Sequence, residues 1–369
     1  MRRLFVLLAT GVAVLFGAAT PAYAHGADAP TATDYRVTVT GISPALPGLT
    51  IRTVEAGARL ELVNDSGTDV EVLGYSGEPY LLIRPDGVWQ NANSPATYLN
   101  ESLAGGVAPP PTAGAGMPPA WQHLSGTPAV LWHDQRTHWT ASRPPSDVLA
   151  DPHRAHHIRD WSIPLRSGTR TFAVTGTLDW QPAPAAGTWW AGCLLLAAAL
   201  GALGLRYRRL LGAVALAAGA AALGYALGVA LDSGALGASG VLRAALTGQT
   251  WPVVCGLAAL AAGGYALARR PAADLALGLA GACVALFAGV ANAAVFAHPV
   301  LPSQWPAQVA RGLILVCVAG GAGIVAAVVL RLRRRPAPPA GTSPGVAPGT
   351  SPRSGGPGDR RRRLGRVAV

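Results

Sequence analysis

The sequence predicts an all-β extracytoplasmic domain, an immunoglobulin-like or cupredoxin-like sandwich, followed by an α-helical bundle of five transmembrane helices. Three observations predict this fold class. The chain opens with the pattern of a secretory signal peptide, its middle carries short segments of alternating polarity, and its second half carries five long apolar stretches. We therefore expect a signal peptide (1–24), an extracytoplasmic β-sandwich domain (25–187), a transmembrane domain (188–335) and a cytoplasmic tail (336–369).

The signal peptide is predicted from three consecutive features. Arg2 and Arg3 form a basic start, Leu4–Phe16 is apolar, and Ala22–Ala24 is a small-residue cleavage site. Cleavage at this site makes His25 the first residue of the mature protein. An uncleaved membrane helix is the alternative, and it is disfavoured because the apolar stretch is short.

The β domain is predicted from period-two alternation, which places every second side chain on one face of a strand. The segments with this pattern are Tyr35–Thr40, Arg59–Val63, Val70–Leu73, Tyr80–Ile83 and Thr171–Leu178. Turn-forming residues at Asn64–Gly67 and Pro85–Gly87 indicate antiparallel strands joined by tight turns. The proline-rich segment Val107–Pro119 is expected to be a surface loop.

The apolar stretches are each long enough to cross a hydrocarbon layer of about 30 Å. They are Trp189–Leu205, Leu210–Leu231, Trp251–Ala268, Ala272–Ala297 and Gly312–Leu330. Arginines follow the first, third and fifth stretches, and basic residues mark the cytoplasmic side. This bias places residues 25–187 outside the cell membrane and the C-terminus in the cytoplasm.

Polar residues are scarce within these stretches. Asn292 is expected to form an interhelical hydrogen bond rather than a transport site, and the Gly224 and Gly228 pair is expected to serve helix packing. Arg311 is expected to extend to the membrane interface. The scarcity of ionisable side chains argues against an ion pump.

The charge distribution argues against nucleic acid as a partner, although the net charge is +11. Residues 25–187 contain 10 Arg and 15 acidic residues, whereas residues 188–369 contain 17 Arg and 3 acidic residues. The basic excess thus lies in the membrane half and in the tail, which is rich in Pro, Gly and Ser and is expected to be disordered.

His25 is the sharpest chemical signal in the sequence. A mature amino-terminal histidine offers a primary amine and an imidazole, which close a chelate ring on Cu(II). In this feature the chain resembles the exported copper-resistance proteins of the CopC type and the histidine brace of copper monooxygenases. All four cysteines lie in apolar stretches, so the β domain offers nitrogen and oxygen ligands, which suit Cu(II) or Zn(II).

Further metal ligands are expected from Asp28 or from the segment Trp132-His-Asp-Gln-Arg-Thr-His-Trp139, where His133, Asp134 and His138 are the donors. In a straight strand the two histidines would face opposite sides, so joint ligation requires a turn between them. The alternative is a structural corner, with both tryptophans in the core and Asp134 paired to Arg136 or to a backbone amide.

The remaining motifs do not predict catalysis. Asp151–His157 is compatible with a helical turn that would pair His153 with His157, but Arg154 stands where a metalloprotease needs Glu. Gly74-Tyr-Ser-Gly77 is not a nucleophile elbow. We expect no enzyme.

Four strings together resemble a family of exported, multi-span membrane proteins of high-GC Gram-positive bacteria. They are Gly74-Tyr-Ser-Gly-Glu-Pro-Tyr80, Ser94-Pro-Ala-Thr-Tyr-Leu-Asn100, Trp132-His-Asp-x-Arg-x-His-Trp139 and Gly176-Thr-Leu-Asp-Trp180. The resemblance implies export and several membrane spans, and it implies no biochemical activity. Gln135 stands where this resemblance leads us to expect histidine in several relatives.

Three functional hypotheses follow. The first is a non-enzymatic binding or interaction protein of the cell membrane, with copper handling as its leading specific version and the lipid bilayer, a metal ion and an envelope protein as partners. The second is a transport component with an external receptor domain and His298 near the entrance. The third is a structural or assembly protein without a metal, whose Tyr- and Trp-rich strings contact a partner.

Overall fold

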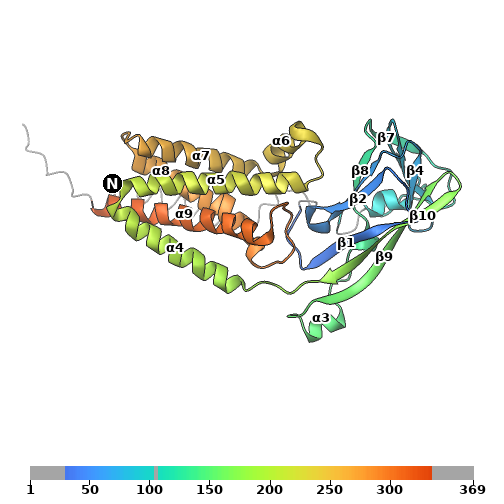
Figure 1. Ribbon diagram of the computed structural model, residues 1–369, viewed down its shortest axis with the longest axis horizontal. Coiled ribbons are helices and arrows are strands. Elements are labelled where there is room, and N and C mark those ends of the chain that lie inside the picture. The colour runs from blue at the N-terminus through green and yellow to red at the C-terminus, as the bar shows by residue number, and fades with distance from the viewer. Residues whose placement is uncertain (1–29, 104–106, 335–369) are drawn as a thin grey trace, which may run out of the picture.

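The computed structural model describes residues 30–103 and 107–334. The predicted signal peptide, His25, Asp28 and the predicted tail therefore lie outside the described residues. The described chain forms a β-sheet domain followed by a helical region (Figure 1).

The β-sheet domain consists of two antiparallel sheets. One has seven strands in the order β1-β10-β9-β4-β5-β6-β7, and the other has three in the order β2-β3-β8. The strands are β1 (Tyr35–Ser43), β2 (Leu49–Val54), β3 (Arg59–Asn64), β4 (Val70–Leu73), β5 (Pro79–Arg84), β6 (Gly87–Asn91), β7 (Trp121–Ser125), β8 (Ala129–Trp132), β9 (His156–Ser167) and β10 (Arg170–Trp180). Both sheets contribute to one apolar core, in which Leu62 of β3 and Ile83 of β5 are fully buried.

The five strands expected from alternation are confirmed as β1, β3, β4, β5 and β10. The turn signal at Pro85–Gly87 is also confirmed, because β5 and β6 pair as a hairpin across it. The prediction of a helical turn at Asp151–His157 is wrong. Helix α3 (Ser146–Ala150) ends before it, and His157 belongs to β9, where its Nδ1 lies 3.0 Å from Asp179 Oδ1.

A close approach explains one glycine of β10. A Cβ at Gly176 would lie 2.1 Å from Cζ2 of Trp161 and 2.2 Å from the carbonyl oxygen of Thr38. Trp161 is 4% exposed and its Nε1 donates to the carbonyl of Thr177 at 3.0 Å. Glycine at this position therefore lets the indole lie across the strand.

The helical region contains five helices long and apolar enough to cross a membrane: Ala186–Arg206, Arg208–Asp232, Thr250–Leu267, Ala273–Phe296 and Ala307–Arg334. They correspond to α4, α5, α7, the consecutive segments α8 (Ala273–Cys283), η3 (Val284–Gly289) and η4 (Val290–Phe296), and α9. All five predicted apolar stretches are thus helical. An additional helix, α6 (Gly237–Gly248), joins α5 to α7.

Glycines bring α5 and α7 close together. A Cβ on Gly219 would lie 2.7 Å from the carbonyl oxygen of Gly256, and one on Gly263 would lie 2.7 Å from that of Gly212. Of the predicted Gly224 and Gly228 pair, only Gly228 makes room for Trp305, since a Cβ there would lie 2.1 Å from its Cδ1. Gly224 contributes its carbonyl, which accepts from Trp305 Nε1 at 2.7 Å. Small residues serve close packing at both places.

Two polar residues of the helices differ from expectation. Asn292 donates to the carbonyl of Ala288 at 3.0 Å, a bond within its own helical segment rather than between helices. Arg311 does not extend outward. It is buried and donates to the carbonyls of Val295 at 2.8 Å and His298 at 2.9 Å. These carbonyls lie at the end of the preceding helical segment, where carbonyls have no partner within the helix itself.

The β-sheet domain rests on one end of the helical region (Figure 1). Thr33 and Val300 exchange two backbone hydrogen bonds of 3.0 and 3.1 Å, and His298 Nδ1 lies 2.8 Å from Asp34 Oδ1. The backbone amide of Ala56 donates to Asp232 at the end of α5. These contacts fix the β domain against the bundle.

Candidate functional site

The candidate site begins where β8 ends. The chain turns through the single-turn helix η2 (Gln135–Thr137), which Asp134 caps by accepting from the backbone amide of Arg136 at 3.1 Å. This turn supplies the reversal that joint ligation by two histidines requires. As a result, His133 and His138 lie on the same side of the turn.

Both histidines contact one backbone oxygen. The Nδ1 of His133 lies 2.8 Å and the Nε2 of His138 lies 3.2 Å from the carbonyl oxygen of Ala58. The two nitrogens are therefore at most about 6 Å apart, the sum of these two distances. The Ala58 carbonyl thus occupies one nitrogen of each ring, and the other nitrogen, Nε2 of His133 and Nδ1 of His138, is the one left to contact another group; the limit of about 6 Å does not apply to these two atoms.

Burial sets the protonation of His138. It lowers the pKa of the imidazole to about 4, with the neighbouring His133 adding in the same direction. The ring is therefore neutral at physiological pH. A neutral imidazole is the form that binds a metal ion.

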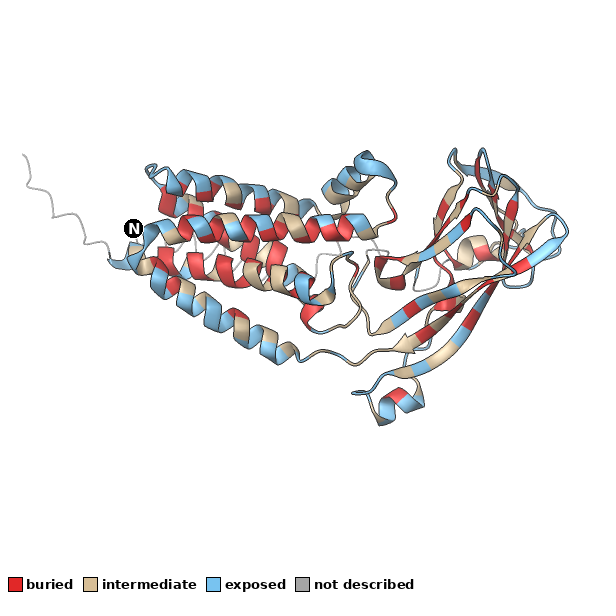
Figure 2. Ribbon diagram, in the orientation of Figure 1, coloured by how far each residue is buried: buried red, intermediate tan, exposed pale blue. Residues whose placement is uncertain are grey.

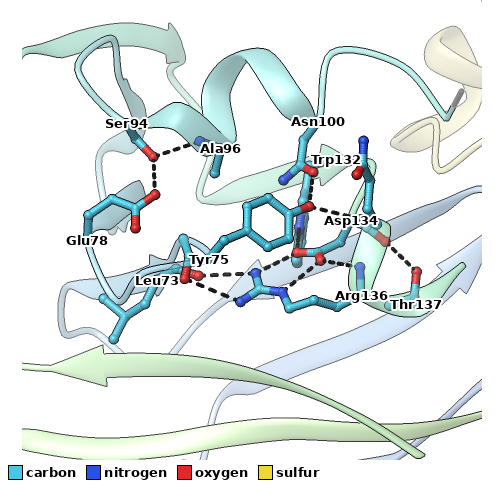
Figure 3. Close-up of polar contacts among 12 residues, drawn as sticks. Leu73, Tyr75, Glu78, Ser94, Ala96, Asn100, Trp132, Asp134, Arg136 and Thr137 are labelled. Atoms are coloured by element: carbon cyan, nitrogen blue, oxygen red, sulfur yellow. Dashed lines mark hydrogen bonds and ion pairs between the residues drawn. The ribbon is translucent and has the colours of Figure 1, made fainter. Parts of the chain in front are cut away.

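Asp134 is committed to a different set of contacts (Figure 3). Its Oδ1 accepts from Nε of Arg136 at 2.8 Å, and its Oδ2 accepts from Nη2 of Arg136 at 2.7 Å and from Nε1 of Trp132 at 3.2 Å. The carboxylate side chain is 0% exposed. The structural corner considered as an alternative is thus present in the Asp134 and Arg136 pair and the buried Trp132, whereas Trp139 is only partly buried. The structure brings His133 and His138 together without Asp134.

The corner belongs to a larger polar network that joins three of the four strings behind the family resemblance (Figure 3). Arg136 stacks 4.9 Å over the ring of Tyr75 and donates to the carbonyl of Leu73 at 3.1 Å. The Tyr75 hydroxyl donates to Asn100 and accepts from the amide of Gln135 at 3.1 Å. Segments far apart in the sequence therefore support the turn that carries the histidines.

Sequence reasoning missed the roles of Tyr75 and Asn100, and of a second buried pair beside them. Glu78, which is 5% exposed, accepts from Ser94 Oγ at 2.9 Å and from the amide of Ser76 at 2.9 Å. Burial raises the pKa of Tyr75 to about 12, and the nearby Asp134 carboxylate adds to this shift. The strings themselves were the only sequence signal for this cluster.

A cavity of about 240 Å³ adjoins the two histidines. Its walls include His133, His138, Trp139, Tyr35 and Pro30. Pro30 is the first described residue, and His25 precedes it by five positions in the sequence. Five residues span at most about 17 Å, so the chain length allows His25 to reach this cavity.

The described part of the chain does not complete a metal site by itself. Within residues 30–103 and 107–334, no three His, Cys, Asp or Glu side chains are arranged to hold a metal ion. His133 and His138 contact the same carbonyl, and a metal site that includes them would need at least one further donor.

Comparison with known proteins finds no protein-family model, no curated protein and no solved structure that matches this chain.

Proposed function

We propose that this chain is a non-enzymatic, multi-pass protein of the bacterial cell membrane whose external β-sandwich binds Cu(II) through His133, His138 and the mature amino-terminal His25. One observation carries the proposal. Two histidines converge on the Ala58 carbonyl at the wall of a cavity that Pro30 also lines. The same cavity is within reach of the amino terminus that signal-peptide cleavage would create.

The donor chemistry favours Cu(II). The proposed set is one amine and three imidazoles, all nitrogen ligands, which suit a tetragonal Cu(II) site better than a soft Cu(I) site. The neutral His138 imidazole needs no proton release before it binds the metal. Asp134 supports the turn and is not a ligand in this proposal, because all its contacts hold Arg136 and Trp132.

The membrane assignment rests on the five apolar helices and on the arginines that end three of them. With this orientation the β domain and the candidate site face the outside, and residues 336–369 face the cytoplasm. The short connection between Trp180 of β10 and Ala186 of α4 keeps the site near the bilayer. The sandwich is of the immunoglobulin or cupredoxin type, and an envelope protein is its natural further partner.

The test uses the full chain, expressed with its signal segment and purified in detergent, with the first residue verified by mass spectrometry. We expect a single Cu(II) site of micromolar or tighter affinity by calorimetry. Substitution of His133 or His138 by Ala should weaken binding at least tenfold, as should one extra residue placed before His25. The matched control is His153→Ala, which changes an exposed histidine outside the site. A Cu(II) affinity that is the same in the wild type and in all of these variants would contradict the proposal.

A further inference from the structure

Helix α6 presents apolar side chains that no other part of the described chain covers. None of its residues is buried (Figure 2). Leu242 is 60% exposed and Leu246 is 50% exposed, and their spacing of four residues places both on one face of the helix. A water-facing helix does not usually carry such a face.

Exposed apolar side chains also occur on the next helix, α7, which is predicted to cross the membrane. Trp251, Val254 and Leu257 of α7 follow directly in the sequence and are also at least half exposed. Because α6 connects α5 to α7, it lies at the end of the bundle on which the β domain rests (Figure 1). Helix α6 therefore lies at the level at which the long helices of the bundle end.

One charged side chain accompanies these apolar residues. Arg243 is the only charged residue between positions 233 and 268. It follows Leu242 directly and is exposed. An exposed arginine beside an apolar face is the arrangement by which amphipathic helices bind the phosphates and the outer acyl region of a bilayer.

We propose that α6 lies in the headgroup region of the outer leaflet, with Leu242 and Leu246 directed into the acyl boundary and Arg243 at the phosphates. The inference rests on the proposed insertion of the five apolar helices, and it is independent of copper binding. The occupant of this face is lipid, because the chain passes directly from α6 into α7, whose first turns also expose apolar side chains.

The position of α6 also bears on the candidate site. The turn between α5 and α6 contains Gly234, which has φ +72° and packs against Leu131; a Cβ at this glycine would lie 2.6 Å from Cδ2 of that leucine. Leu131 directly precedes Trp132 and His133 in the chain. A lipid-bound α6 therefore holds the strand that carries the candidate site at a fixed height above the bilayer.

Site-directed spin labelling of the full chain in nanodiscs containing anionic phospholipid tests this inference. The native cysteines are replaced by Ala, and single labels are attached at Leu242→Cys, Leu246→Cys, Leu257→Cys of α7 and Leu149→Cys of α3. Leu149 is the matched control, because it is 60% exposed on a short helix of the β domain. The readout is the accessibility of each label to oxygen and to a water-soluble nickel complex.

We expect labels at 242 and 246 to be oxygen-accessible and shielded from nickel, at a depth between those at 257 and 149. Nickel accessibility at 242 and 246 equal to that at 149, with 257 still in hydrocarbon, would overturn the inference for α6 alone. Water accessibility at 257 as well would overturn the membrane insertion on which it rests. Shielding of 242 and 246 from both reagents would show a protein contact and would also overturn the inference.

Discussion

Replacement of Asp134 by Asn separates a supporting role from a ligand role. The substitution preserves the shape of the side chain and removes its charge, which leaves Arg136 without its partner. The Asp134 side chain is 0% exposed and that of Arg136 is 18% exposed, so water compensates little. Breaking a buried ion pair costs about 3–5 kcal/mol, and the partial exposure of Arg136 places the expected loss near 3 kcal/mol.

This loss is measurable as a shift in melting temperature. For a domain of this size, 1 kcal/mol corresponds to about 2–4 °C, so Asp134→Asn should lower the Tm of the β domain by roughly 6–12 °C. The assay is thermal unfolding of the full chain in detergent, followed by near-UV circular dichroism. The matched control, Asp160→Asn, alters a carboxylate side chain that is 83% exposed and should change Tm by less than about 2 °C.

The same variant should retain its Cu(II) affinity within about threefold below its melting temperature, because the histidine rings keep their contacts with Ala58. A variant that melts at the same temperature as the wild type and fails to bind Cu(II) would contradict a purely supporting role for Asp134. That result would make Asp134 a metal ligand rather than a support for the turn.

Two further predictions concern stability. His138 has a folded-state pKa of about 4 against an ordinary value of 6.5, so its neutral form stabilises the fold above about pH 6.5 and this contribution is lost as the pH falls toward 4. His138→Gln should therefore flatten the fall of Tm between pH 6.5 and 4, and an unchanged slope would contradict this. Gly176→Ala should lower the free energy of unfolding of the β domain by about 1–3 kcal/mol, because the new methyl group overlaps Trp161 and the Thr38 carbonyl. Gly126→Ala, where no atom lies within 4 Å, is its control, and equal Tm values for the two would count against the packing argument.

Local patterns predicted the strands that alternate cleanly and the five apolar helices. β9 was not predicted, because Pro164 and the polar start at His156 and His157 hide its alternation. β2 and β8 were also not predicted, and their lengths of 6 and 4 residues do not explain this, because β3 and β4 have the same lengths and were predicted. Helix α6 was missed because its residues are small and weakly apolar, and because its exposed leucines have meaning only beside α7.

The candidate site was predictable in its residue types but not in its geometry. The His133 and His138 pair was expected, and the η2 turn that unites the two rings was recognised as a requirement. Their shared contact with Ala58 could not be predicted, since that residue is 75 and 80 positions away in the sequence. Likewise, the support that Tyr75 and Asn100 give to the turn arises from tertiary contacts between distant segments.

Binding of one Cu(II) ion by His25, His133 and His138 can be measured by pulsed electron paramagnetic resonance of the Cu(II)-loaded full chain. The modulation from the remote imidazole nitrogens counts the coordinated histidines. We expect three imidazoles in the mature wild-type chain and two in each of the His133→Gln and His138→Gln variants. The same imidazole count in the wild type and in both variants would contradict this expectation.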